Sequence, residues 1–450
     1  MSGALRSDQP AFSEVLADFH SGSQTPRDYL ERCIAAIEEK ESTVQAFTHQ
    51  NLIKAREAAD ASTKRYAKGA PLSPIDGMPV GVKDIINTRD MPTNMNSEIF
   101  QGHTPLTDAA CVHAVKAGGA YAVGKTVTTE FAIARSGPTT NPHNPAHTPG
   151  GSSSGSAAGT AAGFFSAAFG TQTQGSVIRP ASFCGVVGFK PTLGSLSMDG
   201  VHPLSKSHDH LGILADNVDD AWWLARWTAE IAPEQAHPGL AGPLTGPVAA
   251  AGPATVGLLR TKGFDDLDDA SATAFEDQLK QLNKQGVKII EPEQDSLLAD
   301  LVSALADIPQ RSLELLAYEM RWPYADYIVA HAEKVGERIH NLVSDGQKMT
   351  RDDYIQLLLL QKRLRAQLNS LTGRFSSLIL PASSGPAPEG FEFTGSRELL
   401  VYSTFLGAPA FSIPTMQVDS MPFGLQLIGF HNEDYALTRQ AKWILESSKI

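Results

Sequence analysis

Short apolar runs alternate with segments of helical periodicity along most of this chain, and this alternation limits the folds open to it. The run GMPVGVKD at residues 77–84 predicts a short strand that ends on two charges, and it follows a helical segment at residues 51–68. Residues 109–117 then suit a helix closed by two glycines, and residues 121–124 suit a buried strand. Strands that alternate with helices predict an α/β fold, here with a large mixed central sheet covered by helices on both faces.

The alternation continues to the end of the chain, so we expect a single domain spanning residues 1–450. Residues 232–254 are rich in Pro, Gly and Ala, but strands and helices resume after them, so they predict a surface loop rather than a linker. Residues 294–373 are mostly helical, with a break at Trp322-Pro323. Further strands are expected at 378–380, 410–413 and 424–428, and a last helix at about 433–447.

The composition argues against several classes of function. The chain carries 37 Lys and Arg against 49 Asp and Glu, a net charge of -12, which disfavours non-specific binding of nucleic acid. No apolar run is long enough for a membrane span and no signal peptide is evident, so we expect a cytoplasmic protein that does not bind membranes. The cysteines Cys33, Cys111 and Cys184 are too few and too widely spaced to predict a disulfide framework or a metal site.

Three of the 13 histidines, His202, His208 and His210, cluster in the polar segment around KSHDH. A Ser-His-Asp triad can in principle use one of them. A metal site would need supporting carboxylates or cysteines at ligand spacing, which this segment does not supply. We therefore interpret the cluster as a solvated loop or the rim of a substrate pocket, and we expect neither a metal nor a cofactor.

The stretch TPGGSSSGSAAG at residues 148–159 consists mostly of Gly and Ser and invites several interpretations. Gly151–Gly155 matches the G-x-S-x-G elbow of α/β-hydrolases, but that motif follows a strand, and three prolines between residues 142 and 149 oppose one. A phosphate-binding P-loop needs a Lys after the second Gly, which is missing. A linker is disfavoured because a small-residue helix at 156–169 and a second Gly/Ser turn follow directly. Two such turns around one helix predict two loops of one site.

The sequence around this stretch resembles the amidase signature family of serine hydrolases. Residues 131–192, from FAIARSGPTT to GVVGFKPT, look like that family's signature region. GMPVGVKD resembles its G-x-P-x-x-V-K-D element, and PFGLQLIG at 422–429 resembles its C-terminal strand. The resemblance covers about residues 25–447, with a signature core at about 70–215 and a helical region at about 294–405 that is expected to cover the substrate.

The resemblance implies a catalytic triad of Ser176, Ser152 and Lys83. Ser176 is then the nucleophile, Ser152 follows a cis peptide bond and relays a proton, and Lys83 is the base. A serine hydroxyl is a weak nucleophile that needs a base, and a lysine acts as a base only while it is neutral. Lys83 ends an apolar strand, where burial and nearby charge can lower its pKa.

By the same resemblance, the oxyanion hole consists of four consecutive backbone N–H groups, those of Thr173, Gln174, Gly175 and Ser176. This turn departs from the family pattern G-[ST]-D-T-G-G-S-I-R-x-P, because Gln172 replaces the Asp and Gln174 replaces the first Gly of the pair. Arg179 also lies three residues after the nucleophile instead of two. The Gln174 change matters most, since a Gly there permits positive φ and close approach to substrate. We expect catalysis to survive, because the N–H donor remains.

Asp84, Glu130 and Arg179 are expected to fix loops rather than to react. Gly151, Ser153 and Tyr402 are expected to contact the substrate. Possible apolar lining comes from residues of the helical region, namely Leu315, Leu316, Tyr318, Trp322 and Tyr324. Such lining favours aryl or small hydrophobic amides.

The implied reaction is hydrolysis of a C(=O)–N bond through an acyl-enzyme. Carbamates (urethanes) and esters share its tetrahedral chemistry and stay open as substrates. A second hypothesis is a glutamine amidotransferase subunit that works with a partner. A third is a catalytically impaired binding protein, which Gln174 suggests and the intact triad opposes. The expected ligand is a small amide or carbamate, and the chain is expected to be a monomer or a homodimer.

Overall fold

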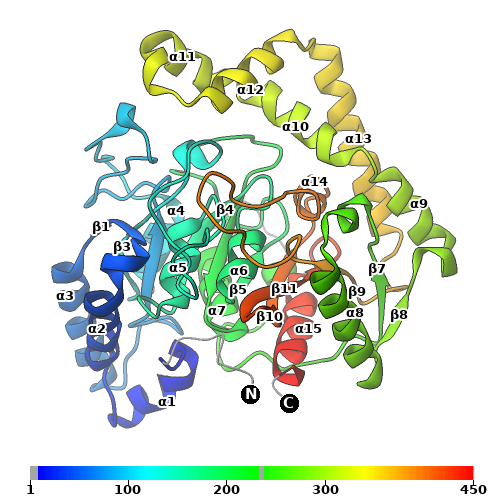
Figure 1. The fold of residues 1–450 in the computed structure, drawn as a ribbon. Coiled ribbons are helices and arrows are strands. Elements are labelled where there is room, and N and C mark those ends of the chain that lie inside the picture. Colours follow the sequence, from blue (N-terminus) through cyan, green and yellow to red (C-terminus); the bar gives the residue numbers. More distant parts are fainter. Residues whose placement is uncertain (1–8, 233–237, 449–450) are drawn as a thin grey trace.

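The computed structural model describes residues 9–232 and 238–448, and the strands of these residues form one 11-stranded mixed sheet (Figure 1). Their order is β1-β3-β2-β4-β6-β5-β10-β11-β9-β7-β8. Parallel pairs join β3, β2 and β4 toward one end and β9, β7 and β8 at the other, with antiparallel pairs between them. The strands span Phe47–Gln50 (β1), Pro79–Lys83 (β2), Tyr121–Thr126 (β3), Ala167–Gln172 (β4), Val187–Lys190 (β5), His210–Ala215 (β6), Thr255–Leu258 (β7), Lys288–Ile290 (β8), Ser377–Pro381 (β9), Ala410–Val418 (β10) and Met421–Ile428 (β11).

The helices lie close to the predicted segments, with α3 and α4 ending within two residues of their expected positions. They span Phe12–Ser21 (α1), Pro26–Val44 (α2), Leu52–Tyr66 (α3), Ala110–Ala117 (α4), Ser154–Ala161 (α5), Ile178–Cys184 (α6), Val218–Ile231 (α7), Asp269–Lys284 (α8), Ser296–Ala304 (α9), Ile308–Glu319 (α10), Arg321–His331 (α11), Glu337–Lys348 (α12), Arg351–Asn369 (α13), Val401–Phe405 (α14) and Asp434–Ser447 (α15). In the described part of the chain, no helix combines the length and the apolar character needed to span a membrane.

Residues of β4 show how helices cover both faces of the sheet. Successive side chains of a strand point to opposite faces. Ala167 and Phe169 lie in one core with Trp222 of α7, whereas Ala168 lies in a second core with Ala157 of α5. The predicted α/β architecture is therefore confirmed, because each face of the same strand packs against its own helices.

The prediction of a single helix at residues 156–169 is wrong in its second half. α5 ends at Ala161, Gly163 adopts a left-handed φ of 80°, and β4 begins at Ala167. The small side chains that favoured a helix here serve a strand that is buried on both faces between β2 and β6. Tertiary packing therefore overrides the local helix propensity.

Helices α9 to α13, residues 296–369, form a helical cap, and Figure 1 shows most of it across the top of the view. The predicted break lies inside α11, where Trp322 has extended dihedrals and precedes a cis proline. The predicted surface loop at 232–254 is irregular apart from one 3-10 turn at Pro238–Leu240 over its described residues, while 233–237 lie outside them. Between β9 and α14 a long segment returns over α6, where Arg179 donates to the carbonyl oxygen of Gly395 at 2.9 Å.

Candidate active site

Lys83 is the last residue of β2, and its fully buried amine lies among hydroxyl groups. Its Nζ donates to Ser152 Oγ and to Thr171 Oγ1, each at 2.8 Å. Thr171 belongs to the parallel neighbour β4, so adjacent strands end at the same edge of the sheet and bring the two side chains together. The Gly151–Ser152 peptide bond is cis. Burial lowers the pKa of Lys83 well below its usual value, and the nearby charge of Asp209 opposes this with a smaller effect.

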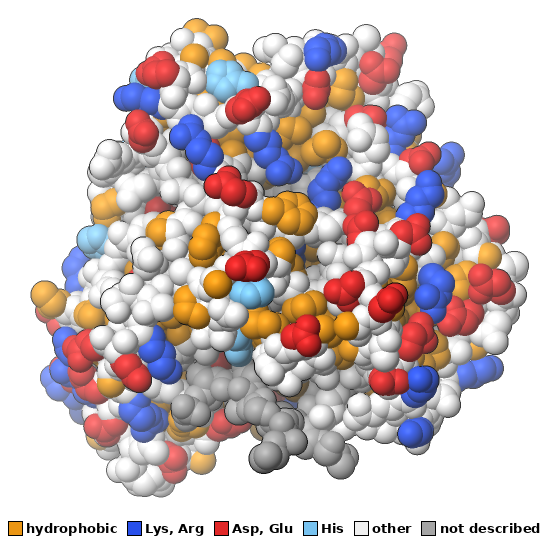
Figure 2. All heavy atoms as spheres, viewed as in Figure 1, with side chains coloured by type: hydrophobic (Ala, Val, Ile, Leu, Met, Phe, Trp, Pro, Cys, Tyr) orange, Lys and Arg blue, Asp and Glu red, His pale blue; other side chains and the backbone are white. Residues whose placement is uncertain are grey.

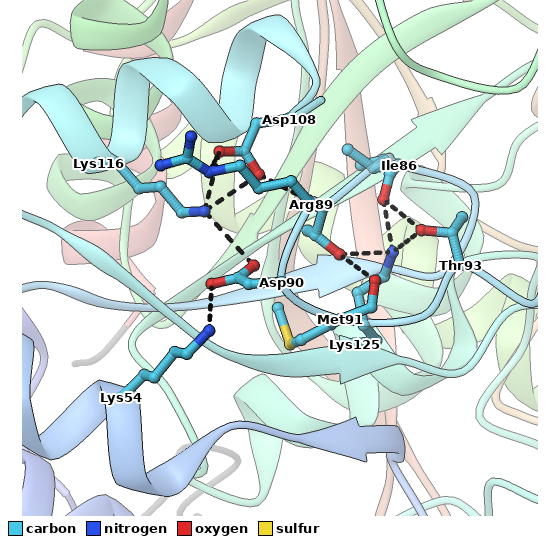
Figure 3. Close-up of polar contacts among 10 residues, drawn as sticks. Lys54, Ile86, Arg89, Asp90, Met91, Thr93, Asp108, Lys116 and Lys125 are labelled. Carbon is cyan, nitrogen blue, oxygen red and sulfur yellow. Dashed lines mark hydrogen bonds and ion pairs between the residues drawn. The ribbon is translucent and has the colours of Figure 1, made fainter. Parts of the chain in front are cut away.

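A second buried lysine on the next strand shows what a structural lysine looks like in this fold (Figure 3). Lys125 of β3 donates to the carbonyl oxygen of Ile86 at 2.5 Å and to Thr93 Oγ1 at 2.7 Å. It also pairs with Asp84 at 3.4 Å, as expected for a carboxylate that fixes structure. Burial lowers the pKa of Lys125 to about 8, and the Asp84 charge opposes a larger change. Lys83 makes no such ion pair within the described residues. Its partners are two hydroxyl groups, which can accept a hydrogen bond from a neutral amine and carry no charge that would favour the ammonium.

Ser176 lies between β4 and α6, in the second Gly/Ser turn. Ser176 and Ser152 both line one pocket with a volume of about 310 Å³. No hydrogen bond joins their hydroxyl groups among the described residues. Ser152 and Ser176 therefore share a single concave surface, and the buried Lys83 lies behind it in contact with Ser152.

The turn before Ser176 is fixed by its neighbours. Gly175 has a φ of 115°, a conformation that L-residues with a side chain rarely adopt, and an added Cβ would approach Leu400 to 2.7 Å. Thr173 Oγ1 donates to Asp209 Oδ1 at 2.6 Å.

Gln172 Oε1 accepts the backbone N–H groups of Val177 and Ile178, each at 3.0 Å. Gln172 thus caps the first turn of α6 with a neutral oxygen where the family pattern has a carboxylate.

The side chain of Gln174 extends away from the turn toward the cap. Its Nε2 donates to Ser312 Oγ of α10 at 2.8 Å, and its Oε1 accepts from Arg397 Nη1 at 3.0 Å. The φ of Gln174 is not positive, so its backbone adopts a conformation that is ordinary for a residue with a side chain. Of the four residues predicted for the oxyanion hole, only Gln174 and Ser176 line the pocket.

The residues predicted to contact the substrate do not line the pocket. Ser153 is buried, and its Oγ donates to the carbonyl oxygen of Thr171 at 3.3 Å. The carbonyl oxygen of Gly151 accepts from Arg179 Nη2 at 2.7 Å. Tyr402 has no exposed surface and packs in a core shared by the cap and the sheet. The contacts of these three residues are with other parts of the protein.

The predicted apolar lining is also absent from this pocket. Leu315, Leu316 and Tyr324 are fully buried in the core. Tyr318 stacks on Tyr354 with ring centroids 4.3 Å apart. Trp322, 71% exposed, lies on the surface. The side chains on these cap helices thus point into the core or into solvent, and not toward Ser176.

Three arginines that the sequence did not single out for binding line the pocket instead. Arg179 comes from α6, Arg338 from the first turn of α12, and Arg397 from the segment before α14. The segment 392–398 and residues of the 129–136 loop complete the wall. A long polar segment between a strand and a helix is the one local signal that could have pointed here, because such loops often carry binding residues.

The histidine cluster is not a solvated loop. His208 and His210 are buried, and burial lowers the pKa of His208 to about 3. His208 Nδ1 lies 3.0 Å from Ser205 Oγ, and the chain around it packs against α10 and α13. The polar composition of the segment KSHDH predicts exposure to solvent, but the helical cap packs over this segment.

Comparisons with known proteins agree with this architecture. A family model described as Amidase matches residues 28–438. AtzE, the 1-carboxybiuret hydrolase subunit of Pseudomonas sp. (strain ADP), is 30% identical over 441 residues, 92% of this chain and 93% of that protein. A glutamyl-tRNA(Gln) amidotransferase subunit of Geobacillus kaustophilus (strain HTA426) is 28% identical over 446 residues, 92% of each chain.

Among solved structures, the native peptide amidase from Stenotrophomonas maltophilia is similar with a TM-score of 0.80 and 25% identity. That likeness covers 99% of this chain and 98% of the other. A family model and a shared fold that both extend over nearly the whole sequence show that this chain is an amide-hydrolysing enzyme of the amidase signature family.

Proposed function

We propose that Ser176, Ser152 and Lys83 hydrolyse a C(=O)–N bond through an acyl-enzyme. The observation that carries this proposal is the buried contact of 2.8 Å between Lys83 Nζ and Ser152 Oγ, at the wall of the pocket that Ser176 also lines. A lysine whose pKa is lowered by burial loses its proton more readily, and the neutral amine can then act as a base.

The proton moves along this line of groups. As Ser176 Oγ attacks the carbonyl carbon, its proton passes to Ser152 Oγ while the Ser152 proton passes to Lys83 Nζ. The backbone N–H groups of the turn at residues 173–176 stabilise the negative oxygen of the tetrahedral intermediate. Collapse of the intermediate returns a proton through Ser152 to the leaving amine. Water then attacks the acyl-enzyme by the same steps in reverse and releases the acid.

Variants at the proposed triad test this assignment. We expect Ser176→Ala and Lys83→Met to lower kcat on any amide that the enzyme cleaves by at least about 1,000-fold, because removing one member of a catalytic unit removes most of its effect. A fluorophosphonate probe should label the wild type on Ser176 and leave Ser176→Ala unlabelled. Ser303→Ala, at an exposed serine of α9, is the control and should react like the wild type. Full turnover by Ser176→Ala would refute the proposal, and wild-type protein without label or turnover would favour the impaired binding protein.

Substrate preference is a separate question from this chemistry. The apolar lining that favoured aryl or small hydrophobic amides is missing from the pocket, so that preference loses its support. A panel of aryl amides, carbamates, esters and glutamine distinguishes the leaving groups, since all pass through the same tetrahedral intermediate.

The relatives favour a second candidate, a protein that acts as one component of a complex. AtzE and the Geobacillus amidotransferase relative are both named as subunits, and both align with more than 90% of this chain. Under this candidate the protein releases ammonia from glutamine and co-purifies with a partner from its source cells. A monomer or homodimer with full activity on a simple amide would contradict it.

A further inference from the structure

Three guanidinium groups gather at the pocket without a carboxylate partner. Within the described residues, none of Arg179, Arg338 and Arg397 forms an ion pair with Asp or Glu, although most other ion pairs of the fold involve arginine. Burial lowers the pKa of Arg179 to about 9, and the nearby charges of Arg338 and Arg397 contribute to this in the same direction. Positive charges held together without an ion-paired carboxylate stabilise a bound anion.

The acidic side chains of the same pocket offset only part of this charge, because three arginines but two glutamates line it. Burial lowers the pKa of Arg397, and the charge of Glu398 opposes this with a smaller effect. Glu392 and Glu398 also line it, but neither carboxylate is hydrogen-bonded to an arginine in the described part of the chain. Glu130, which lies next to the wall, is already occupied by Arg135 at 3.0 Å and by the N–H of Gly336 at 3.0 Å. Figure 2 shows Lys and Arg side chains below the top of the view, with acidic side chains interspersed among them.

The three arginines have different numbers of donors left for a ligand. Both terminal nitrogens of Arg179 donate hydrogen bonds to protein oxygens, including the carbonyl oxygens of Gly395 and Gly151. Among the described residues, Arg397 donates through Nη1 alone, to Gln174 Oε1 and to the carbonyl oxygen of Pro309 at 2.8 Å. Arg338 is exposed and makes no hydrogen bond among the described residues. Arg338 and Arg397 therefore keep free N–H groups, while Arg179 adds fixed positive charge behind them.

Gln174 links this charge to the catalytic turn. Its amide is held by Ser312 on one side and holds Arg397 on the other, two residues before Ser176. The glycine of the family pattern has no side chain that could make this link. The departure at position 174 thus fixes one arginine at a defined place relative to the nucleophile.

We propose that the enzyme acts on amides that carry a carboxylate, which Arg338 and Arg397 bind, and that Gln174 positions Arg397 for this contact. The guanidinium fork matches the two oxygens of a carboxylate. A pocket of about 310 Å³ suits a short molecule, such as the monoamide of a dicarboxylic acid with the amide carbonyl at Ser176. This inference rests on the proposed hydrolytic function, because it names the substrate class of the same site.

Matched substrate pairs test the charge preference. Succinamate and glutaramate carry a carboxylate, and butyramide and valeramide have the same chain lengths without the charge. We expect the wild type to prefer the anionic members by roughly 100-fold or more in kcat/KM, as two charge-assisted contacts permit. Arg397→Gln and Arg338→Gln should each raise KM for succinamate by roughly 10- to 100-fold, and should lower kcat/KM for succinamate by a larger factor than kcat/KM for butyramide. Arg311→Gln, which removes a charge from α10 outside this pocket, is the matched control and should change neither value. Equal use of charged and neutral amides by the wild type would overturn the inference.

A double-mutant cycle separates positioning by Gln174 from a general structural effect. Gln174→Met keeps the length of the side chain and the backbone N–H, so we expect KM for succinamate to rise by a larger factor than KM for butyramide. If Gln174 acts through Arg397, the double variant with Arg397→Gln is no worse than Arg397→Gln alone. Additive losses, or an equal loss on butyramide, would show that Gln174 does not act by positioning Arg397.

Binding of succinate provides a readout that needs no turnover. Titration calorimetry should detect succinate binding to Ser176→Ala and a roughly 10- to 100-fold weaker affinity once Arg397→Gln is added. Ser176 labelling with turnover of neutral amides, but no arginine-dependent binding, would refute the carboxylate site and leave the hydrolytic function standing. Arginine-dependent succinate binding without labelling or turnover would support the carboxylate site and refute the hydrolytic function.

Discussion

Single residues of this site derive their chemistry from their surroundings. Lys83 and Lys125 lie at equivalent depth on neighbouring strands, but one contacts two hydroxyl groups and the other a carboxylate and a carbonyl. Burial without a counterion favours the neutral amine, whereas a nearby carboxylate favours the ammonium. Asp209 influences Lys83 from farther away, and burial raises the pKa of Asp209 to about 6.

Removing the Asp209 charge should change the pH dependence of the reaction. Above about pH 6, the ionised carboxylate raises the pKa of Lys83, so Asp209→Asn should lower that pKa further. Because the base acts when neutral, the acid limb of kcat/KM should move to lower pH. The amide oxygen of Asn can still accept the N–H groups of Leu204 and Ser205 that now bind Oδ2.

The measurement is kcat/KM for one amide between about pH 4 and about pH 10. Asp199→Asn, at an exposed aspartate, controls for the loss of one negative charge from the molecule and should leave the limb in place. A limb that stays fixed or moves to higher pH in Asp209→Asn would contradict the assignment of Lys83 as the base.

At the scale of elements, the junction between β4 and α6 decides the shape of the turn at residues 173–176. The first N–H groups of a helix have no partner within the helix. Gln172 satisfies two of them at the start of α6 and anchors its own amide on Thr404 of α14 at 3.0 Å. One buried side chain thus connects the strand, the helix that follows Ser176, and the helix after the arginine-bearing segment.

Gln172→Met should destabilise the fold, because it leaves two buried N–H groups unpaired while keeping the side-chain volume. We expect a loss of about 2–4 kcal/mol in the free energy of unfolding, since each unpaired buried group costs about 1–3 kcal/mol. Urea unfolding followed by circular dichroism measures it. Gln356→Met, at an exposed position of α13, is the matched control and should stay within about 0.5 kcal/mol of the wild type. Equal stability of both variants would mean that Gln172 is not a cap.

At the scale of the whole molecule, the cap and the sheet share one core. Leu298, Leu315 and Leu364 of the cap pack in the same cluster as Leu378 of β9 and Tyr402 of α14. Cap helices that bury their apolar faces against the sheet have no separate core to fold around. The single domain that the sequence predicts stays a prediction, and its cooperativity is the property to measure.

We expect the chain to unfold in urea in one transition, with ellipticity and the fluorescence of its five tryptophans changing together. Leu364→Ala, in the buried face of α13, should lower the free energy of unfolding by about 2–5 kcal/mol and shift both signals equally. Leu359→Ala on the exposed face of the same helix should have little effect. Two separate transitions, or a shift in only one signal, would show that the cap unfolds independently.

Much of the fold and part of the site follow from local patterns. β2, α4 and β3 could be predicted because apolar runs and glycine boundaries mark them in the sequence. The strand at Ala167–Gln172 could not, because its small residues favour a helix until both its faces are covered. Tyr402 and the apolar residues of the cap were misjudged for a related reason, since composition says that a side chain is apolar but not which way its helix turns it.

The α/β class, the family, and the serines and lysine proposed for the chemistry follow from the amino-acid order alone, because each depends on short motifs whose order is fixed along the chain. The side chains that surround these residues depend instead on how the chain packs. Arg179, Arg338 and Arg397 are separated by more than 200 residues in total, and no local pattern relates them, but helix, cap and returning segment place all three on one pocket. Charge at a site depends on distances in space, and those are set by the packing of the whole chain.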